Sequence, residues 1–306
     1  MGKIAFMFPG QGAQYVGMGK DFYDTIPLCR EVFEKASKAS GLDVEKLCFE
    51  ENEQINITEY TQIAMLAAEV AMLKALEEKG IKPDVTGGLS LGEYGALVAC
   101  GVMSEEDVFK VVRKRGIYMQ EAVPTGGAMV AVLGLDTKVI EEICDSIDGM
   151  VTIANYNCPG QIVITGEEKA VKEAMEKLTE AGAKRCVPLK VSGPFHSPLL
   201  TGAGEKLAKE LEEVTIGDIA IPYIANVTAD YVASKEEVKP LLQKQVSSSV
   251  KWQQTIELMI KDGVTTFIEI GPGKTLTGFM RKINRDVQVL NVEKVEDLEK
   301  VVEALK

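Results

Sequence analysis

Residues 84–101 read DVTGGLSLGEYGALVACG, and residues 88–92 within them form a G-x-S-x-G motif. The preceding residues 82–86 predict a short buried strand, and the spacing of Tyr94, Leu97 and Val98 predicts a helix that ends at Gly101. A strand, a tight glycine-flanked turn and a helix are the setting of a nucleophile elbow, which pushes a serine outward. The alternative is a glycine-rich turn whose serine only caps the helix. The flanking elements favour Ser90 as a nucleophile, with free N–H groups at the helix start for an oxyanion.

Composition describes an ordinary globular chain of 306 residues, long enough for two domains or for one domain with an insertion. The formal net charge of −12 argues against nucleic acid or an anionic membrane as a partner. No apolar run approaches the roughly 20 residues of a membrane span, so we expect a cytoplasmic protein. Six scattered cysteines and a single histidine form no zinc-type ligand set, so we expect reduced, buried thiols and no metal.

The order of predicted elements divides the chain. Residues 1–125 and 197–306 alternate strands and helices, as a parallel α/β sheet does, and they form the large catalytic domain. Residues 126–196 follow a β-α-β-β-α-β order, which predicts an inserted ferredoxin-like small domain. The run GPGKT at 271–275 lacks the first glycine of a Walker motif, because that position is Ile268, and we interpret it as a strand-to-helix turn.

Arg115 is the unusual residue of the helix predicted over 104–122, which starts with a capping pair of Ser104 and Asp107. It shares the apolar stripe that includes Val108 and Met119, whereas Arg113 and Lys114 are expected to point toward water. An inward arginine needs a partner, because an unpaired buried charge is costly. An internal salt bridge, a snorkelling stem and an anion-binding role all satisfy that need.

His196, in the sequence GPFHSP, is the only histidine and hence the only ordinary base for Ser90. It lies where the inserted unit returns to the large domain, which would let it face the elbow across a cleft. The sequence identifies no acid as a third member, so a backbone carbonyl or an amide could orient the imidazole instead.

Taken together, these residues resemble the malonyl-CoA:acyl-carrier-protein transacylases and, more widely, the acyltransferase domains of fatty-acid and polyketide synthases. The resemblance covers essentially the whole chain. Its motifs are FPGQG (8–12), GLSLGEY (88–94), RGIYMQ (115–120), NYNCPGQ (155–161), FHS (195–197), QVSSSVKW (245–252) and GPGKTLTG (271–278).

The resemblance implies that Ser90 is acylated and that His196 is its base, oriented by the backbone carbonyl of Gln245. It implies an oxyanion hole from the N–H groups of Gln11 and Leu91. Arg115 would bind the malonyl carboxylate, and Phe195 resembles the malonyl-selective form of the pocket. Two further residues of the matching motifs, Met119 and Asn157, are expected to line the substrate site.

The implied fold is an α/β-hydrolase-like core with a parallel sheet plus an inserted ferredoxin-like small domain. The implied activity is a ping-pong transfer of malonyl from coenzyme A to Ser90 and then to the thiol of acyl carrier protein, which supplies fatty-acid biosynthesis. Malonyl-CoA and acyl carrier protein are thus the expected partners, coenzyme A thioester is a substrate with no cofactor needed, and a monomer is expected.

Two positions depart from the family pattern. Leu89 replaces the usual histidine before the serine, which suggests that this position is not essential to the base chemistry. Ser249 replaces a common proline, which predicts a looser backbone there. Both expected partners are anionic, so we also predict a local positive rim near the cleft, built from Lys184, Arg185, Lys190, Lys274, Arg281, Lys282 and Arg285.

Three other functions stay open at this point. A polyketide-type acyltransferase would use the same chemistry on a different carrier. A serine thioesterase or esterase would share the elbow but would not need a cation at Arg115. A catalytically inactive, carrier-binding subunit would not need Ser90, His196 and Arg115 together.

Overall fold

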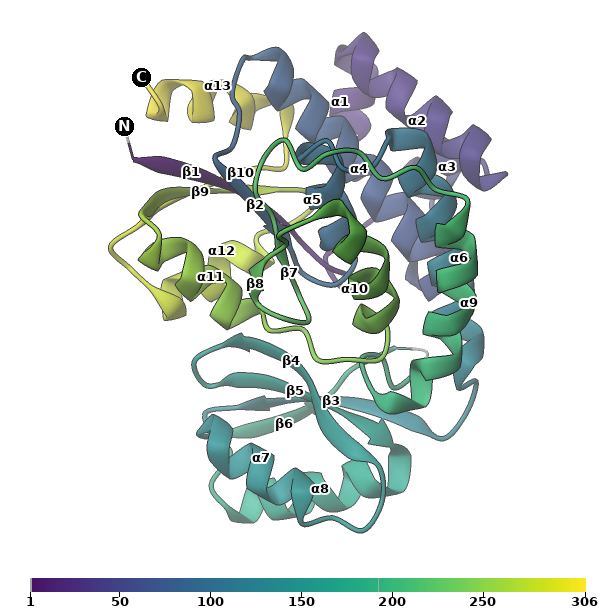
Figure 1. Ribbon diagram of the computed structural model, residues 1–306, viewed down its shortest axis with the longest axis vertical. Helices are drawn as coiled ribbons and strands as arrows, with labels where there is room; N and C mark the ends of the chain where they lie inside the picture. Colours follow the sequence, from purple (N-terminus) through teal and green to yellow (C-terminus); the bar gives the residue numbers. More distant parts are fainter. Residues whose placement is uncertain (1, 192) are drawn as a thin grey trace.

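The computed structural model describes residues 2–191 and 193–306. A parallel sheet forms the centre of the larger part, with strand order β10-β9-β1-β2. Its strands are β1 (Lys3–Phe8), β2 (Val85–Gly88), β9 (Val264–Ile270) and β10 (Gln288–Val292). Helices cover both faces of this sheet, as Figure 1 shows, so the outer parts of the chain have the α/β organisation expected from the sequence.

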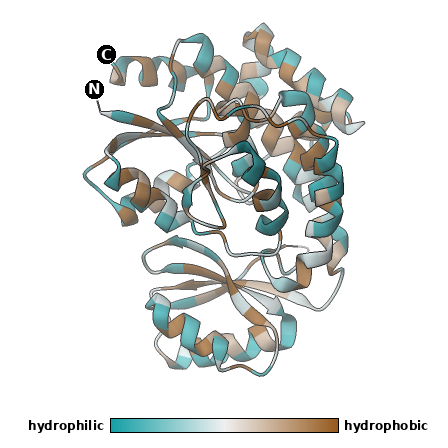
Figure 2. Cartoon of the chain, in the orientation of Figure 1, coloured by the Kyte–Doolittle hydropathy of each residue, from teal (hydrophilic) through white to brown (hydrophobic). Residues whose placement is uncertain are grey.

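Strand β1 shows why both faces of the sheet are buried. Its residues from Ala5 to Phe8 have no exposed surface. Because successive side chains point to opposite faces of a strand, Phe6 and Phe8 join the apolar cluster beneath the helices α4 (Thr58–Glu78) and α5 (Gly92–Ala99). Ala5 and Met7 join the cluster beneath α11 (Trp252–Lys261) and α12 (Thr275–Ile283). Figure 2 shows hydrophobic colour along the strands and alternating hydrophobic and hydrophilic colour along the helices around them.

The helices of this part vary in length from nearly two to nearly six turns. They are α1 (Lys20–Thr25), α2 (Pro27–Ser40), α3 (Val44–Phe49), α4 (Thr58–Glu78), α5 (Gly92–Ala99), α6 (Glu105–Ala122), α9 (Thr201–Glu212), α10 (Val238–Gln245), α11 (Trp252–Lys261), α12 (Thr275–Ile283) and α13 (Val295–Ala304), with short 3₁₀ turns η1 (Gln54–Asn56), η2 (Pro198–Leu200) and η3 (Lys235–Glu237). The spacing of Ile63, Leu66 and Val70 predicts a single apolar face for this segment. Helix α4 is instead buried on every side, because other helices and the sheet surround it.

A second, antiparallel sheet forms the smaller part, with strand order β4-β5-β3-β6. Its strands are β3 (Gly127–Leu133), β4 (Val151–Cys158), β5 (Gln161–Glu167) and β6 (Arg185–Pro188), and α7 (Thr137–Asp145) and α8 (Glu168–Glu180) cover its outer face (Figure 1). Strand β4 lies against α11 and α12 of the larger part. The β-α-β-β-α-β order predicted for this segment is confirmed.

Most elements occur where the sequence predicts them, with three differences. The sequence predicts a strand over 220–226, but the structure contains only β7 (Ile224–Ala225) there, which pairs with β8 (Asp230–Tyr231) in a two-stranded ribbon. The sequence predicts a polar connection over 50–59, and the structure places a 3₁₀ turn and the start of α4 there. The sequence analysis did not anticipate the short helices α1 and α3 or the C-terminal helix α13.

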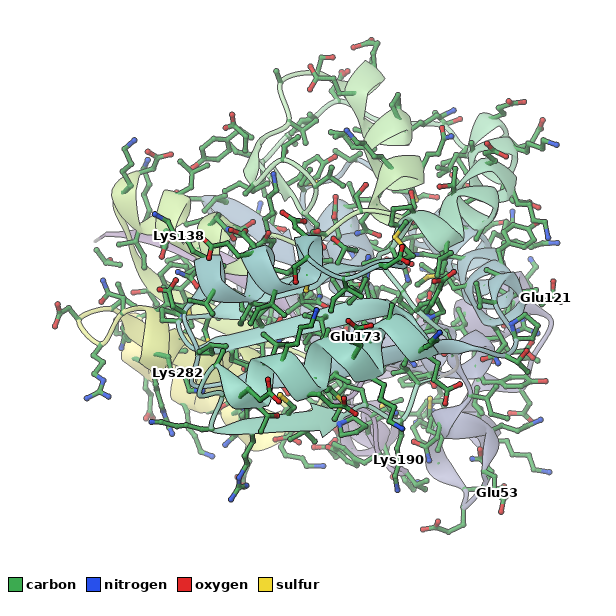
Figure 3. The ribbon with its side chains drawn as sticks, turned by 90° about the horizontal axis from the view of Figure 1, so that it is seen from below. Glu53, Glu121, Lys138, Glu173, Lys190 and Lys282 are labelled. Carbon is green, nitrogen blue, oxygen red and sulfur yellow. The ribbon has the colours of Figure 1, made fainter. Side chains whose placement is uncertain are left out.

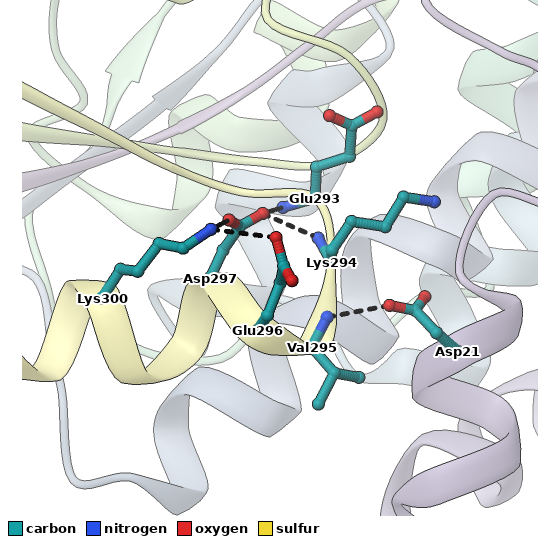
Figure 4. A network of polar contacts seen from close by, with 7 residues as sticks. All are labelled: Asp21, Glu293, Lys294, Val295, Glu296, Asp297 and Lys300. Atoms are coloured by element: carbon teal, nitrogen blue, oxygen red, sulfur yellow. Dashed lines mark hydrogen bonds and ion pairs between the residues drawn. The ribbon is translucent and has the colours of Figure 1, made fainter.

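Helix α13 is anchored by acidic side chains, as Figure 4 shows. Asp297 Oδ2 accepts hydrogen bonds from the N–H groups of Glu293 (3.2 Å) and Lys294 (2.9 Å). Asp21, on α1, accepts from the N–H of Val295 at 2.8 Å. These bonds satisfy backbone donors around the helix start and tie the end of the chain to its first helix.

Across the described residues, no helix combines the length and the apolar character that a membrane crossing requires. The cysteines are all free thiols; five of them are buried, as expected, but Cys186 is partly exposed at the edge strand β6.

The parallel sheet places three loops at one edge. Strands β1, β2 and β9 run in the same direction, and their carboxyl ends lead into residues 9–12, 89–91 and 271–274. The last of these loops is the strand-to-helix turn predicted from GPGKT. Ligands bind at this edge in open α/β sheets, so the fold brings the glycine-rich loop and the G-x-S-x-G motif together.

Candidate active site

The turn that carries Ser90 requires glycine on both sides. Ser90 has a φ of 55°, in the left-handed region that side chains rarely adopt. A Cβ added to Gly88 would lie 1.9 Å from the carbonyl oxygen of Gly92, and one added to Gly92 would lie 2.1 Å from the carbonyl oxygen of Phe8. The backbone can therefore turn this sharply, and pass this close to β1, only with glycine at both positions.

Ser90 and His196 are in direct contact. Ser90 Oγ lies 2.7 Å from His196 Nε2, and His196 Nδ1 lies 2.9 Å from the carbonyl oxygen of Gln245. Because a carbonyl only accepts, Nδ1 carries the proton and Nε2 is left as the acceptor for the serine hydroxyl. Gln245 ends α10, and His196, at a φ of 59°, is held by a further bond from its N–H to the carbonyl of Val246 (3.2 Å).

His196 is neutral at physiological pH. Its side chain is buried, and the loss of hydration, reinforced by the positive charge of Arg115, lowers the pKa of His196 to about 4. A neutral imidazole with a free Nε2 can accept the serine proton.

Arg115 is buried to 1% exposure beside these two residues. Its Nη1 donates to Gln62 Oε1 (2.7 Å), and its Nη2 donates to Gln245 Oε1 (3.0 Å) and to Ser90 Oγ (3.1 Å). Within the described part of the chain it forms no ion pair with a carboxylate, and its Nε has no hydrogen-bond partner. The internal salt bridge considered from the sequence is therefore absent from these residues, and the snorkelling alternative is wrong.

The side-on edge of the Arg115 guanidinium, Nε and Nη2, is the edge that grips a carboxylate with two parallel bonds. Nη2 points at Ser90 Oγ and Nε is unpartnered among the described residues. Arg113 differs from its expectation, because it is only partly exposed and pairs with Glu59 at 3.0 Å.

Two backbone N–H groups flank the serine. That of Leu91 follows Ser90 at the start of α5, and that of Gln11 belongs to the loop after β1. Neither group has an acceptor among the described residues. Their strands end side by side, so both loops border the space in front of Ser90.

A cavity of about 210 Å³ opens in front of Ser90. Its lining comes from both parts of the molecule and joins Gln11, Leu91, Arg115, Met119, Phe195 and His196 with Asn157 of β4. Asn157 Oδ1 is buried and has no partner in the described residues. Gln245 lies behind this lining and reaches the site through its contacts. The structure thus brings together every site residue named from the sequence.

Three polar residues of the site were not anticipated. Gln62 of α4 supports Arg115; Asn226 accepts from the N–H of Ser90 (2.7 Å); and Glu93 accepts from Gln245 Nε2 (2.7 Å). Only Glu93 could have been found from the sequence, because it belongs to the GLSLGEY motif. The other two come from distant segments that show no pattern of their own.

Leu89 and Ser249, the two positions that depart from the family pattern, have defined contacts in the structure. Leu89 packs against the apolar cluster of α11 and α12 and lines the cavity. The looser backbone expected at Ser249 is contradicted: Ser249 Oγ donates to the carbonyl of Ile153 (2.6 Å), and the N–H of Val250 donates to Ala154 (2.8 Å). A serine hydroxyl and a strand-like bridge thus tie this segment to β4.

The basic residues proposed as a rim are all exposed. Lys282, on α12, donates to Gln161 Oε1 on β5 at 3.1 Å and so spans the two parts of the molecule. Figure 3 shows Lys282 and Lys190 at separate places around the smaller part, with acidic residues such as Glu173 among them.

The arrangement can be compared with known proteins. Residues 5–300 match the family described as acyl transferase domain. The malonyl CoA-acyl carrier protein transacylase of Bacillus subtilis is 45% identical over 311 aligned residues, covering 100% of this chain and 98% of that protein. The crystal structure of MCAT from Streptococcus pneumoniae is 48% identical with a TM-score of 0.95, covering 99% of this chain and 100% of that one.

A third relative was solved as a type II PKS acyl-carrier protein in complex with its malonyl-transacylase, with 38% identity, a TM-score of 0.96 and 99% of both chains covered. Match length, identity and structural similarity agree with the serine, histidine and arginine that the fold gathers around one cavity. The chain therefore belongs to the acyl transferase domain family and, within it, to the malonyl CoA-acyl carrier protein transacylases.

Proposed function

We propose that this enzyme transfers malonyl from coenzyme A to the phosphopantetheine thiol of acyl carrier protein through a malonyl ester on Ser90, for fatty-acid biosynthesis. The observation that carries the proposal is Arg115: a buried guanidinium without an ionic partner among the described residues points at the serine oxygen from 3.1 Å. In a malonyl ester the carboxylate carbon is three bonds from Oγ, so a guanidinium 3.1 Å from Oγ is close enough to bind the carboxylate. An enzyme for uncharged acyl groups has no use for such a cation.

The first half-reaction follows from the contacts of Ser90. His196 Nε2 takes the hydroxyl proton as Oγ attacks the thioester carbonyl, and the N–H groups of Gln11 and Leu91 hold the resulting oxyanion. The imidazolium then gives the proton to the departing sulfur of coenzyme A. The carbonyl of Gln245 stabilises the protonated ring, and no carboxylate among the described residues bonds to it.

The second half-reaction reverses these roles. The thiol of acyl carrier protein enters the space that coenzyme A has left, His196 removes its proton, and the sulfur attacks the carbonyl carbon of the malonyl ester. The ester bond to Ser90 Oγ then breaks, and the imidazolium returns the proton to Oγ. Arg115 holds the carboxylate throughout, and Met119, Phe195 and Asn157 line the same cavity around the acyl group. Coenzyme A is a substrate in this scheme, and we propose that no metal or cofactor takes part.

The finer description of the fold is also a proposal. We assign residues 1–125 and 197–306 to an α/β-hydrolase-like catalytic domain and residues 126–196 to an inserted ferredoxin-like domain. The elbow between β2 and α5 supports the first assignment. The second is supported by two helices on one face of an antiparallel sheet whose middle strands are the first and third of the segment.

The acyl carrier protein is expected to approach the cavity mouth along the exposed basic residues of β6 and α12. The relative solved with an acyl-carrier protein supports a carrier as the second substrate. The net charge of −12 supports a protein that binds neither nucleic acid nor an anionic membrane. Free, mostly buried thiols support a reducing, cytoplasmic setting. We propose a monomer, because one chain supplies every group of the site.

Intact-mass measurement tests the proposal directly. Wild-type enzyme mixed with malonyl-CoA should gain the mass of one malonyl group, and Ser90→Ala should gain none while staying folded. Adding acyl carrier protein should then discharge the adduct onto the carrier. An adduct on Ser90→Ala would remove the serine from its assigned role, and a wild-type adduct that only water discharges would identify a thioesterase.

The identity of the carrier forms a second question, because the relative with 38% identity was solved with a PKS carrier. Discharge of the malonyl enzyme onto a fatty-acid carrier and onto a polyketide carrier, compared at equal concentrations, separates the two biosynthetic roles. We expect faster transfer to the fatty-acid carrier.

A further inference from the structure

Glu93 is a buried carboxylate directly behind the catalytic pair. It lies in the first turn of α5, three residues after Ser90, and only 1% of its surface is exposed. Its Oε2 accepts hydrogen bonds from Gln245 Nε2 (2.7 Å) and from the N–H of Asn226 (3.1 Å). Glu93 does not line the cavity, so it acts on the reaction only through its neighbours.

Gln245 connects Glu93 to the residues on either side of the nucleophile. Its Oε1 accepts from Arg115 Nη2 (3.0 Å) while its Nε2 donates to Glu93, so one amide lies between the guanidinium and the carboxylate. The backbone carbonyl of the same residue receives the Nδ1 proton of His196. A shift of the Gln245 side chain would therefore disturb both the carboxylate-binding group and the base.

The side-chain amide of Gln245 also couples two buried charges. Without substrate, Arg115 and Glu93 are opposite charges linked through a neutral amide. A malonyl carboxylate on Arg115 would add a second negative charge, and Glu93 would then lose part of the compensation that favours its ionised form. Burial already raises the pKa of Glu93 to about 7, against the opposing effects of its bonds from Gln245 and Asn226 and of the charge of Arg115.

The other titratable groups around Glu93 do not carry a charge that could replace it. Burial raises the pKa values of Tyr94 and Cys100, on its own helix, and of Tyr223, next to β7. Burial lowers the pKa of His196 to about 4. All four are neutral near pH 7, so Arg115 and Glu93 determine the charge balance behind Ser90.

We propose that Glu93 is a positioning residue that acts through Gln245, and that it takes up one proton from solvent when the malonyl carboxylate docks on Arg115. The inference rests on the proposed function, because it requires malonyl to bind Arg115. The proton adds to Glu93, the bond from Gln245 Nε2 to its Oε2 is kept, and the proton returns to solvent when malonyl leaves with the carrier.

Calorimetry of malonyl-CoA binding tests the proton uptake. Ser90→Ala prevents turnover, and titrations at pH 7.5 in buffers of different ionisation enthalpy report the protons taken up per malonyl-CoA bound. We expect about half a proton or more for Ser90→Ala and close to none for Ser90→Ala with Glu93→Gln. Equal uptake by the two proteins would overturn the proposal and assign the proton to another group, such as His196.

Glu69→Gln is the matched control. Glu69, on α4, is also fully buried and also does not line the cavity. Unlike Glu93, its carboxylate has no hydrogen-bond partner among the described residues, so it has no bond to Gln245. In the Ser90→Ala background it should leave proton uptake unchanged. Tight binding of malonyl-CoA without proton uptake would contradict only the role of Glu93, whereas failure of every variant to bind malonyl-CoA would contradict the proposed function.

Kinetics separate the two roles of Glu93, which are to position the Gln245 amide and to carry a charge that changes when malonyl binds. Glu93→Gln keeps an oxygen acceptor for Gln245, so kcat should stay within about threefold of wild type, and KM for malonyl-CoA should lose its rise between pH 6.5 and 8. Glu93→Ala leaves the Gln245 amide without that acceptor and should lower kcat/KM about ten- to hundredfold. A Glu93→Gln enzyme as impaired as Glu93→Ala, or a wild-type KM independent of pH, would refute the proposal.

Discussion

Replacing Arg115 should separate the recognition of malonyl from the chemistry at Ser90. The guanidinium is buried and stands 3.1 Å from Ser90 Oγ, with its Nε unpartnered among the described residues. Malonyl has a carboxylate for the Nε–Nη2 edge and acetyl has none. Arg115→Ala should therefore impair malonyl transfer far more than acetyl transfer. Arg115→Lys should restore only part of the loss, because a lysine ammonium cannot reproduce the two parallel hydrogen bonds of the guanidinium edge.

The size of the loss follows from the two bonds removed. A hydrogen bond to a charged group contributes about 1.5–3 kcal/mol, so the two bonds from Nε and Nη2 to the carboxylate contribute about 3–6 kcal/mol. Water that enters the space left by the side chain recovers part of this, which leaves about 3–4 kcal/mol. At 1.36 kcal/mol per decade, kcat/KM for malonyl-CoA should fall by between about two and three decades.

The assay is kcat/KM for malonyl-CoA and acetyl-CoA, measured in parallel on wild type, Arg115→Ala and Arg115→Lys. Acetyl transfer should change little or rise, because acetyl has no carboxylate for the guanidinium to bind. Circular dichroism and melting curves check that the variants fold. Equal losses with the two donors would show that Arg115 serves the structure alone and would refute the assignment of the carboxylate site.

Three other outcomes are expected. His196→Ala should lower both half-reactions by about 10²- to 10⁴-fold, and a loss below about tenfold, seen in single-turnover acylation, would identify another base. The acid limb of kcat/KM for malonyl-CoA should lie near pH 4, because burial and Arg115 hold the pKa of His196 at about 4 and the neutral form is the base; a limb near pH 6.5 would contradict this. Reversing two exposed charges with Lys282→Glu and Arg285→Glu should raise KM for acyl carrier protein and weaken its salt dependence, and unchanged carrier kinetics across a salt series would refute the proposed rim.

Local sequence determined the parts of this protein whose partners lie close along the chain. The elbow depends on Gly88, because a Cβ there would collide with the backbone of Gly92, four residues on. Helix α6 begins where the hydroxyl of Ser104 accepts from the N–H of Asp107, three residues on, and its periodicity correctly placed Arg115 inward. Such features could be read from spacing because sterics and short-range hydrogen bonds produce them.

Tertiary structure alone decided what those residues face. Arg115 bonds to Gln62 and Gln245, which are 53 and 130 residues away, and Glu93 meets Gln245 across 152 residues. No local pattern encodes such contacts. They arise because the carboxyl ends of parallel strands share one edge and because packing brings α4, α6 and α10 around it. The sequence alone could place a cation inward; the fold made it a guanidinium without a carboxylate partner among the described residues, beside a serine, with a buried carboxylate one amide away.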